Sequence, residues 1–198
     1  MQNDKRMAGT YEVINSIHIG DKEIALGENM NDPHGLFYMV CDIKGNEVFE
    51  HYYNILCSDN FIEIAKLYGE RVNEQITKTA TELEQENVPR LIVTEDMCKK
   101  DIFSENLEGK LLVIKADILY PEYRTATHQI MRCTGGNGAR PDGIGMSVFG
   151  DLLFSGKHMK YGRMDILGEL KPEHYPEWIN SKIKELDVKK KDHKEKEH

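Results

Sequence analysis

Arginine and glycine gather in one segment of the chain, between Tyr120 and Trp178. An arginine guanidinium is a planar fork that donates two parallel hydrogen bonds to adjacent phosphate oxygens. A glycine-rich turn can open its backbone N–H groups to an anion in the same way. The segment therefore predicts a site for phosphate or nucleic acid, carried by Arg124, Arg132, Arg140, Arg163, Gly135, Gly136 and Gly138.

The glycine turn, CTGGNGARPDGIG at positions 133–145, matches neither of the common nucleotide-binding motifs. A P-loop requires Lys followed by Ser or Thr, and a dinucleotide fingerprint requires a helix after its glycines, whereas Gly138 runs into Ala-Arg-Pro. A purely structural turn is the alternative interpretation, because glycine is also needed where the backbone adopts positive φ or approaches another segment closely.

His128 lies among these arginines and is a candidate for acid–base chemistry. Histidine titrates near neutral pH, so its imidazole could assist the attack of a 2′-hydroxyl on a neighbouring RNA phosphate. The alternative is an ordinary surface or core histidine. Since no Ser-His-Asp, Cys-His or paired-carboxylate pattern accompanies it, the sequence leaves open whether the protein is an enzyme.

The cysteines and the apolar residues indicate the compartment. Cys41, Cys57, Cys98 and Cys133 include no C-x-x-C pair and have no histidine at metal-ligand spacing, which predicts buried reduced thiols and no metal site. No cofactor motif is recognised. The chain has no run of about 18 apolar residues, and its N-terminus MQNDKRMAGT lacks the apolar centre of a signal peptide. We therefore expect a cytoplasmic protein that does not bind membranes.

The charge is distributed unequally along the chain. Positions 1–87 hold 7 Lys and Arg against 16 Asp and Glu, a net charge of −9, whereas the remainder holds 19 against 18, a net charge of +1. The division predicts that the first half faces a basic protein surface and the second half a phosphate-bearing partner. The alternative is that the acidic residues form solvated faces that keep the protein in solution.

The first half predicts a β-meander followed by a long helix. Turn residues separate strands at 11–19, 23–26, 36–43 and 47–55. A possible N-cap at positions 58–60 then opens a helix to about Glu86. Its apolar residues recur at three- and four-residue steps and predict a stripe packed on the meander: Phe61, Ile64, Ala65, Tyr68, Val72, Ile76, Ala80 and Leu83.

Pro89 ends this pattern and predicts a boundary between two subdomains, 1–87 and 88–187. The second subdomain is predicted to be mostly β, with strands at 110–115, 128–133, 145–154, 157–163 and 165–170 and a C-terminal helix at 172–186. The charged residues from 188 to 198 have nothing apolar to bury and predict a disordered tail. The fold class is therefore α+β, an antiparallel meander with a long helix followed by a mostly-β half.

Two runs in the second half, MRCTGGNGARPDGIGMSVF and KYGRMDILGELKPEHYPEW, resemble an accessory domain of Gram-positive conjugative elements and phages. That family is of the large polyvalent protein-associated type, in which the domain occurs alone or fused to DNA methyltransferase and helicase polyproteins. The runs YEVINSIHIGDKEIALGEN and MVCDIKGNEVFEHYYNILCSDNFIEIAKLYGERVNEQ are similar to the segments that precede it there. The chain more loosely resembles stand-alone type II-A anti-CRISPR proteins.

The resemblance implies a mobile-element counter-defence protein of the bacterial cytoplasm, an anti-CRISPR inhibitor of a Cas9-type effector. Its partners would be the effector, its guide RNA, or both, with the acidic half on protein and the arginine-bearing half on phosphate. A guide-directed ribonuclease that uses His128 is one alternative. A non-catalytic accessory module for conjugation or DNA-modification proteins is another. The sequence does not indicate the oligomeric state.

Overall fold

The computed structural model describes residues 5–45, 50–100, 103–143 and 146–185, and the α+β class is confirmed. The chain folds into two compact units, Met1–Asn87 and Val88–His198. The predicted charged tail at 188–198 lies outside the described residues. No helix in the described part of the chain is long and apolar enough to span a membrane.

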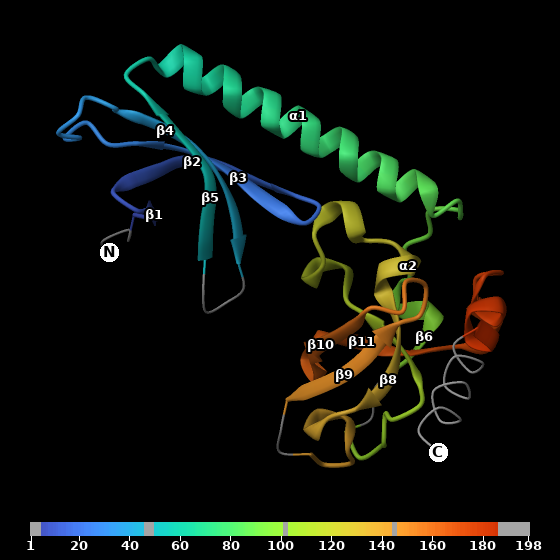
Figure 1. Cartoon of the computed structure of the whole chain (residues 1–198). Coiled ribbons are helices and arrows are strands. Elements are labelled where there is room, and N and C mark those ends of the chain that lie inside the picture. Colours follow the sequence, from blue (N-terminus) through green and yellow to red (C-terminus); the bar gives the residue numbers. More distant parts are fainter. Residues whose placement is uncertain (1–4, 46–49, 101–102, 144–145, 186–198) are drawn as a thin grey trace, which may run out of the picture. The chain divides into compact units, whose positions relative to one another are not determined.

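The first unit is an antiparallel sheet of five strands in chain order with one long helix after it (Figure 1). Each strand pairs with the next along the chain, as the turn residues predicted, and a short N-terminal strand is added to the four expected. The elements are β1 (Met7–Ala8), β2 (Tyr11–Ile19), β3 (Lys22–Glu28), β4 (Tyr38–Gly45), β5 (Glu50–Ser58) and α1 (Phe61–Gln85).

Local capping explains where α1 begins and ends. The Asn60 side chain accepts hydrogen bonds from the N–H groups of Ile62, at 3.0 Å, and Glu63, at 3.4 Å, which satisfies two amides of the first turn. After the last turn, Asn87 adopts a positive φ of 49°, a conformation that commonly follows a helix. Pro89 then prevents the helix from continuing.

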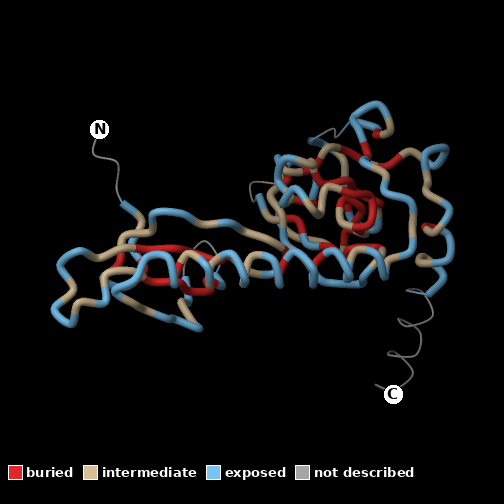
Figure 2. Tube along the Cα trace, turned by 90° about the horizontal axis from the view of Figure 1, so that it is seen from above, coloured by how far each residue is buried: buried red, intermediate tan, exposed pale blue. Residues whose placement is uncertain are grey.

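One face of the first sheet packs against the first half of α1. The buried residues Ile24, Leu26, Val40 and Ile64 form this core, with partly buried side chains of α1 around them. Figure 2 shows that buried residues follow the middle of the sheet, whereas most of the helix remains accessible. The predicted stripe is therefore correct for the part of the helix that lies over the strands.

The prediction that the apolar stripe is buried is wrong for the second half of α1. Ile76 is 46% exposed and Ala80 is exposed, whereas Gln75 and Thr79 are buried. Gln75 Nε2 donates to the Ile19 carbonyl at 3.0 Å, and a Cβ on Gly20 would collide with the Thr79 hydroxyl. The helix here meets the polar backbone of the β2–β3 turn, so hydrogen-bonding side chains face inward and apolar ones face solvent.

The strand β1 and Arg6, the residue before it, close the opposite face of the sheet. Arg6 donates to Glu23 on β3, at 2.6 and 2.9 Å, and to Glu50 on β5, at 2.6 Å. The Tyr52 hydroxyl donates to the Met7 carbonyl at 3.0 Å, which joins the two edge strands. The Arg6 guanidinium also holds the pKa of the Glu23 carboxyl below its usual value.

The second unit contains a six-stranded antiparallel sheet in the order β10-β9-β8-β7-β11-β6. The strands are β6 (Cys98–Lys99), β7 (Leu111–Ile114), β8 (Ile130–Gly135), β9 (Ser147–Leu152), β10 (His158–Gly162) and β11 (Ile166–Leu170). β11 lies between β7 and β6, so the middle of the sheet depends on pairing between segments far apart in the sequence.

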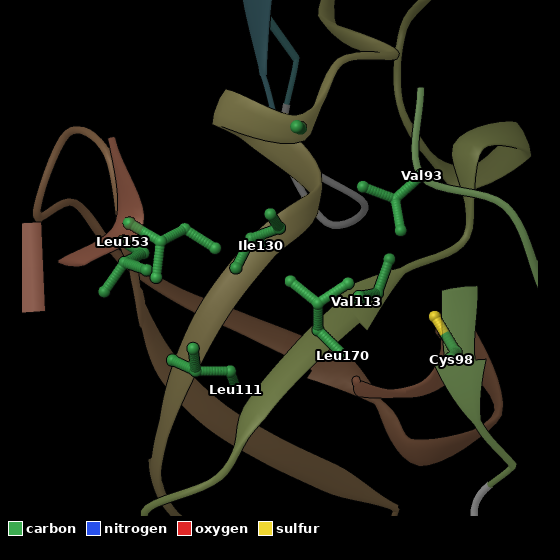
Figure 3. Close-up of a cluster of buried hydrophobic side chains, with 9 residues drawn as sticks. Val93, Cys98, Leu111, Val113, Ile130, Leu153 and Leu170 are labelled. Atoms are coloured by element: carbon green, nitrogen blue, oxygen red, sulfur yellow. The ribbon is translucent and has the colours of Figure 1, made fainter. Parts of the chain in front are cut away.

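Buried hydrophobic clusters lie on both faces of this sheet. Leu111, Val113, Ile130, Leu153 and Leu170 belong to one buried cluster, and Figure 3 shows several of them pointing toward one another from neighbouring strands. The alternate residues of the same strands form a second cluster on the other face, which contains Leu112, Ile114, Met131, Cys133, Val148, Leu152 and Ile166.

The predicted C-terminal helix is shorter than expected. Pro172–His174 forms a 3₁₀ turn, and helical residues run from 179 to 185, the last described position. Ile179 is fully buried in the first cluster, with Trp178 and Ile183 packed against it. The segment therefore covers part of one face of the second sheet.

The first prediction tests which apolar residues of α1 are buried against the sheet. Ile64→Ala should lower the free energy of unfolding by about 2–4 kcal/mol, because it leaves a cavity between helix and sheet. Ile76→Ala, the matched control on the same helix, should change it by less than about 0.5 kcal/mol. Urea unfolding followed by the helical circular dichroism signal measures both. Equal losses would contradict the packing.

Candidate nucleic-acid interface

The glycine turn is shaped by close packing against β9. Gly135 and Gly136 have φ of +140° and +115°, and a Cβ on Gly136 would collide with the Ser147 carbonyl. Only glycine fits this conformation without strain. The residues that follow, Asn137–Ala139, form a 3₁₀ turn in which Gly138 and Ala139 are buried. These glycines therefore have a structural role in the path of the chain.

Three backbone amides of the turn are engaged within the unit. The N–H groups of Ala139, Asp142 and Gly143 donate to the carbonyls of Gly136, Phe103 and Arg140 respectively, at 3.1 to 3.2 Å. A cradle of amides open to an anion was expected here, and these three amides do not contribute to one.

Arg163 lies inside the second unit rather than on its surface. The residue is 3% exposed, and its guanidinium donates to the carbonyls of Gly138, at 2.8 Å, Arg140, at 3.1 Å, and Glu105, at 3.2 Å. It also stacks over the Phe103 ring, 4.6 Å from the centroid. Expected as a phosphate ligand, Arg163 instead fastens the glycine turn to the preceding loop, because each donor satisfies a carbonyl of that backbone.

The other arginines of the predicted set lie apart in the fold. Arg140 is exposed at the end of the glycine turn. Arg124 is half-buried, and its Nε donates to the Leu119 carbonyl at 3.1 Å. Arg132 belongs to β8, where its backbone is paired with both β7 and β9.

His128 belongs to the short helix α2 (Ala126–Gln129) and not to the strand in which it was expected. Its Nδ1 lies 3.2 Å from the Thr125 hydroxyl and 3.0 Å from the Thr127 hydroxyl, and its ring stacks on Tyr123 at 4.5 Å. These contacts fix the orientation of the imidazole. Its assignment as a general acid or base stays a prediction.

The strand register gathers a different set of side chains on one face of β8, β9 and β10. Arg132 pairs directly with Asp151, Asp151 pairs with His158, and Phe149 pairs with Lys160. Directly opposed residues of an antiparallel sheet point to the same side, as do residues two apart along a strand. All five side chains therefore share one face, which we call the open face.

Side-chain contacts confirm this arrangement. His158 Nδ1 lies 2.7 Å from the Asp151 carboxylate, and the His158 ring stacks on Phe149 with centroids 6.1 Å apart and planes 12° from parallel. Phe149 is 36% exposed and the His158 side chain is 61% exposed. On the β8 side, Phe149 is paired with Gly135, which has no side chain to cover the ring.

The open face thus combines an exposed aromatic pair with cationic groups. Arg132 and Lys160 carry positive charge, His158 acquires one when protonated, and Asp151 carries one negative charge. Exposed aromatic rings on a sheet are stacking platforms for unpaired bases, and neighbouring cations bind the phosphates between those bases. The arrangement is suited to single-stranded nucleic acid.

Arg132 of the open face was predicted from the sequence, as was Gly135 beside Phe149, whereas Phe149, Asp151, His158 and Lys160 were missed. Period-two spacing on either side of the Ser155-Gly156 hairpin turn was the available signal, since it places Phe149 with Asp151 and His158 with Lys160. Which strand lies beside which cannot be read from that spacing alone.

The cysteines are thiols of ordinary packing. Cys41, Cys98 and Cys133 are buried and Cys57 is half-buried, and all four are free. Burial raises the pKa of the Cys41 and Cys98 thiols to about 11, so both are neutral at physiological pH and poor nucleophiles. In the described parts of the chain, no cluster of three or more His, Cys, Asp or Glu side chains has the arrangement of a metal site.

Comparison of the chain with protein-family models, with curated proteins and with solved structures found no match.

The second prediction tests the structural role of Arg163. Arg163→Ala should destabilise the second unit by about 3 kcal/mol or more, since it leaves buried carbonyls without donors. Arg140→Ala, at an exposed position of the same turn, should cost less than about 0.5 kcal/mol. Trp178, the single tryptophan, reports unfolding of this unit by fluorescence. Similar losses for the two variants would contradict the assignment.

Proposed function

We propose that the protein is a mobile-element counter-defence protein that inhibits a Cas9-type effector, with the open face of its second unit bound to single-stranded guide RNA. The main support for RNA binding is the stacked pair of Phe149 and His158, which shares its face of the sheet with Arg132 and Lys160. The link to Cas9-type effectors rests on the resemblance of the chain to proteins of conjugative elements and to type II-A anti-CRISPR proteins.

The first unit has the charge expected of a surface that contacts basic protein. On α1, acidic side chains are exposed along the length of the helix: Glu63, Glu70, Glu74, Glu82 and Glu84. Lys66 and Lys78 lie within 4 Å of Glu70 and Glu82, so part of this charge is compensated within the helix. A Cas9-type effector holds its RNA–DNA heteroduplex in a positively charged channel, to which an acidic surface is complementary.

The ribonuclease alternative rests on the fixed orientation of His128. Two threonine hydroxyls and the Tyr123 ring hold its imidazole, as a general acid or base requires. It differs from the binding proposal in its consequence for the guide, which would be shortened rather than kept intact.

The third prediction concerns RNA binding by the open face. Phe149→Leu keeps an apolar side chain but removes the aromatic ring, and stacking of one base contributes about 1–3 kcal/mol, so the dissociation constant should rise by about tenfold or more. Fluorescence anisotropy with labelled single-stranded guide RNA measures this change. Phe154→Leu, a control for loss of a ring elsewhere in the second unit, should leave the affinity unchanged.

The same assay distinguishes phosphate contacts from general charge. Joint replacement of Arg132 and Lys160 by Ala should lower the salt dependence of binding by roughly one unit of slope for each lost phosphate contact. Lys100→Ala removes an exposed positive charge elsewhere in the unit and serves as the matched control. RNA binding that is unaffected by all three changes on the open face would remove the basis of the proposal.

The fourth prediction concerns inhibition in cells. Co-expression with a Cas9-type effector and a matching guide should restore phage or plasmid survival, and the guide should remain full-length. If the guide is shortened and His128→Ala abolishes shortening while RNA binding persists, the protein is a ribonuclease, because general acid–base assistance contributes about 10²- to 10⁴-fold in rate. Survival unaffected across several type II effectors would favour the accessory module instead.

A further inference from the structure

The first unit contains an open pocket of about 310 Å³ beside the middle of β5, separate from the open face of the second unit. Its walls come from the start of β3, from β4, from β5 and from α1. The pocket is lined by Lys22, Asp42, Asn54, Ile55, Leu56, Arg71 and Glu74.

Asp42 forms the floor of the pocket. Its side chain is 3% exposed, and its carboxylate accepts from Lys22 Nζ at 3.1 Å, from Asn54 Nδ2 at 3.0 Å and from Arg71 Nη1 at 3.3 Å. A buried carboxylate requires such partners. Here the partners come from three different elements, so Asp42 fixes the positions of both cationic groups.

Both cations have donors that Asp42 does not occupy. A guanidinium has five N–H donors and an ammonium has three. Among the described residues, Asp42 is the acceptor that Arg71 and Lys22 contact, and their side chains are 16% and 23% exposed. Their remaining donors are therefore available to an acceptor in the pocket.

The side of the pocket is apolar. Ile55 and Leu56 are 51% and 47% exposed, an unusual state for neighbouring large side chains on a strand. They follow Asn54, whose φ of 52° marks the irregularity in the pairing of β4 with β5. A bulge interrupts the regular alternation of side chains along a strand, and both Ile55 and Leu56 line the pocket here.

The charges select the ligand. Lys22 and Arg71 together exceed the charge of Asp42 by one positive unit, and the exposed Glu74 of the same lining brings the formal charge of the pocket to zero, which opposes a ligand with a large negative charge. We propose that the pocket binds a monocarboxylate with an aliphatic body, its carboxylate on Arg71 and Lys22 and its body on Ile55 and Leu56. A planar carboxylate matches the fork of an arginine. The C-terminal residue of a peptide and a small free acid share this chemistry.

The test uses N-acetyl-leucine as the probe and N-acetyl-leucinamide, which lacks the carboxylate, as its control. N-acetyl-leucine should shift the amide NMR signals of residues 54–56 and 71–74, with a dissociation constant of about 1 mM for a ligand of this size. N-acetyl-leucinamide should shift none of them. The proposal is overturned if the two compounds act alike, or if neither shifts these signals.

Variants of α1 make the test specific. Arg71→Gln should weaken binding by about tenfold or more, as expected when a charge-assisted bidentate contact is lost. Lys78→Gln, which removes a charge from an exposed position of the same helix, should leave it unchanged. Glu74→Gln leaves the contacts of Asp42 in place and should strengthen binding by about twofold. If Glu74→Gln weakens binding, the ligand is not held by its negative charge.

A tetrapeptide that ends in leucine distinguishes the two sources of the carboxylate. Tighter binding of the free-acid tetrapeptide than of N-acetyl-leucine, with loss of binding on C-terminal amidation, identifies a chain terminus. Weaker binding of the tetrapeptide identifies a small free acid. Both results support the monocarboxylate site, whereas binding of the amidated tetrapeptide at equal strength contradicts it.

Discussion

The register of β8, β9 and β10 is the constraint on which the second unit and its candidate site both depend. Side chains alternate along a strand, so the pairing that places Met131, Val148 and Leu152 in the core also places Phe149 and His158 on the open face. A slip of one residue would exchange the two sets. The stability of the core therefore maintains the arrangement of the surface.

Three features hold that register. Gly136 lets the chain pass against the Ser147 carbonyl, and Arg163 ties the glycine turn to the loop before β7 through backbone carbonyls. At the other end of β9, the hairpin turn closes through a hydrogen bond of 2.7 Å from the Gly156 N–H to the Leu152 carbonyl. Gly136 and Arg163 were predicted to bind phosphate. They instead help to position the surface that we propose binds it.

Much of the first unit could be predicted because its strand pairs and its helix form between residues close together in the sequence. Turn residues and helical periodicity identified the meander and α1, since each strand pairs with its neighbour in sequence. Burial of Gln75 in place of Ile76 could not be predicted, because it depends on which backbone meets the helix. Burial of Arg163 likewise depends on carbonyls far away in the sequence. The partnership of Phe149 with His158 required the register, which residue types alone do not define.

Photo-crosslinking tests the central claim most directly. Single-stranded guide RNA that carries 4-thiouridine, bound to the whole protein and irradiated, should attach to the segment from Ser147 to Gly162, which contains Phe149 and His158 of the open face. Mass spectrometry of the digested adduct locates the attachment. The adduct should be lost in Phe149→Leu and retained in Phe154→Leu. Attachment chiefly to His128, to the 137–140 turn or to the first unit would contradict it.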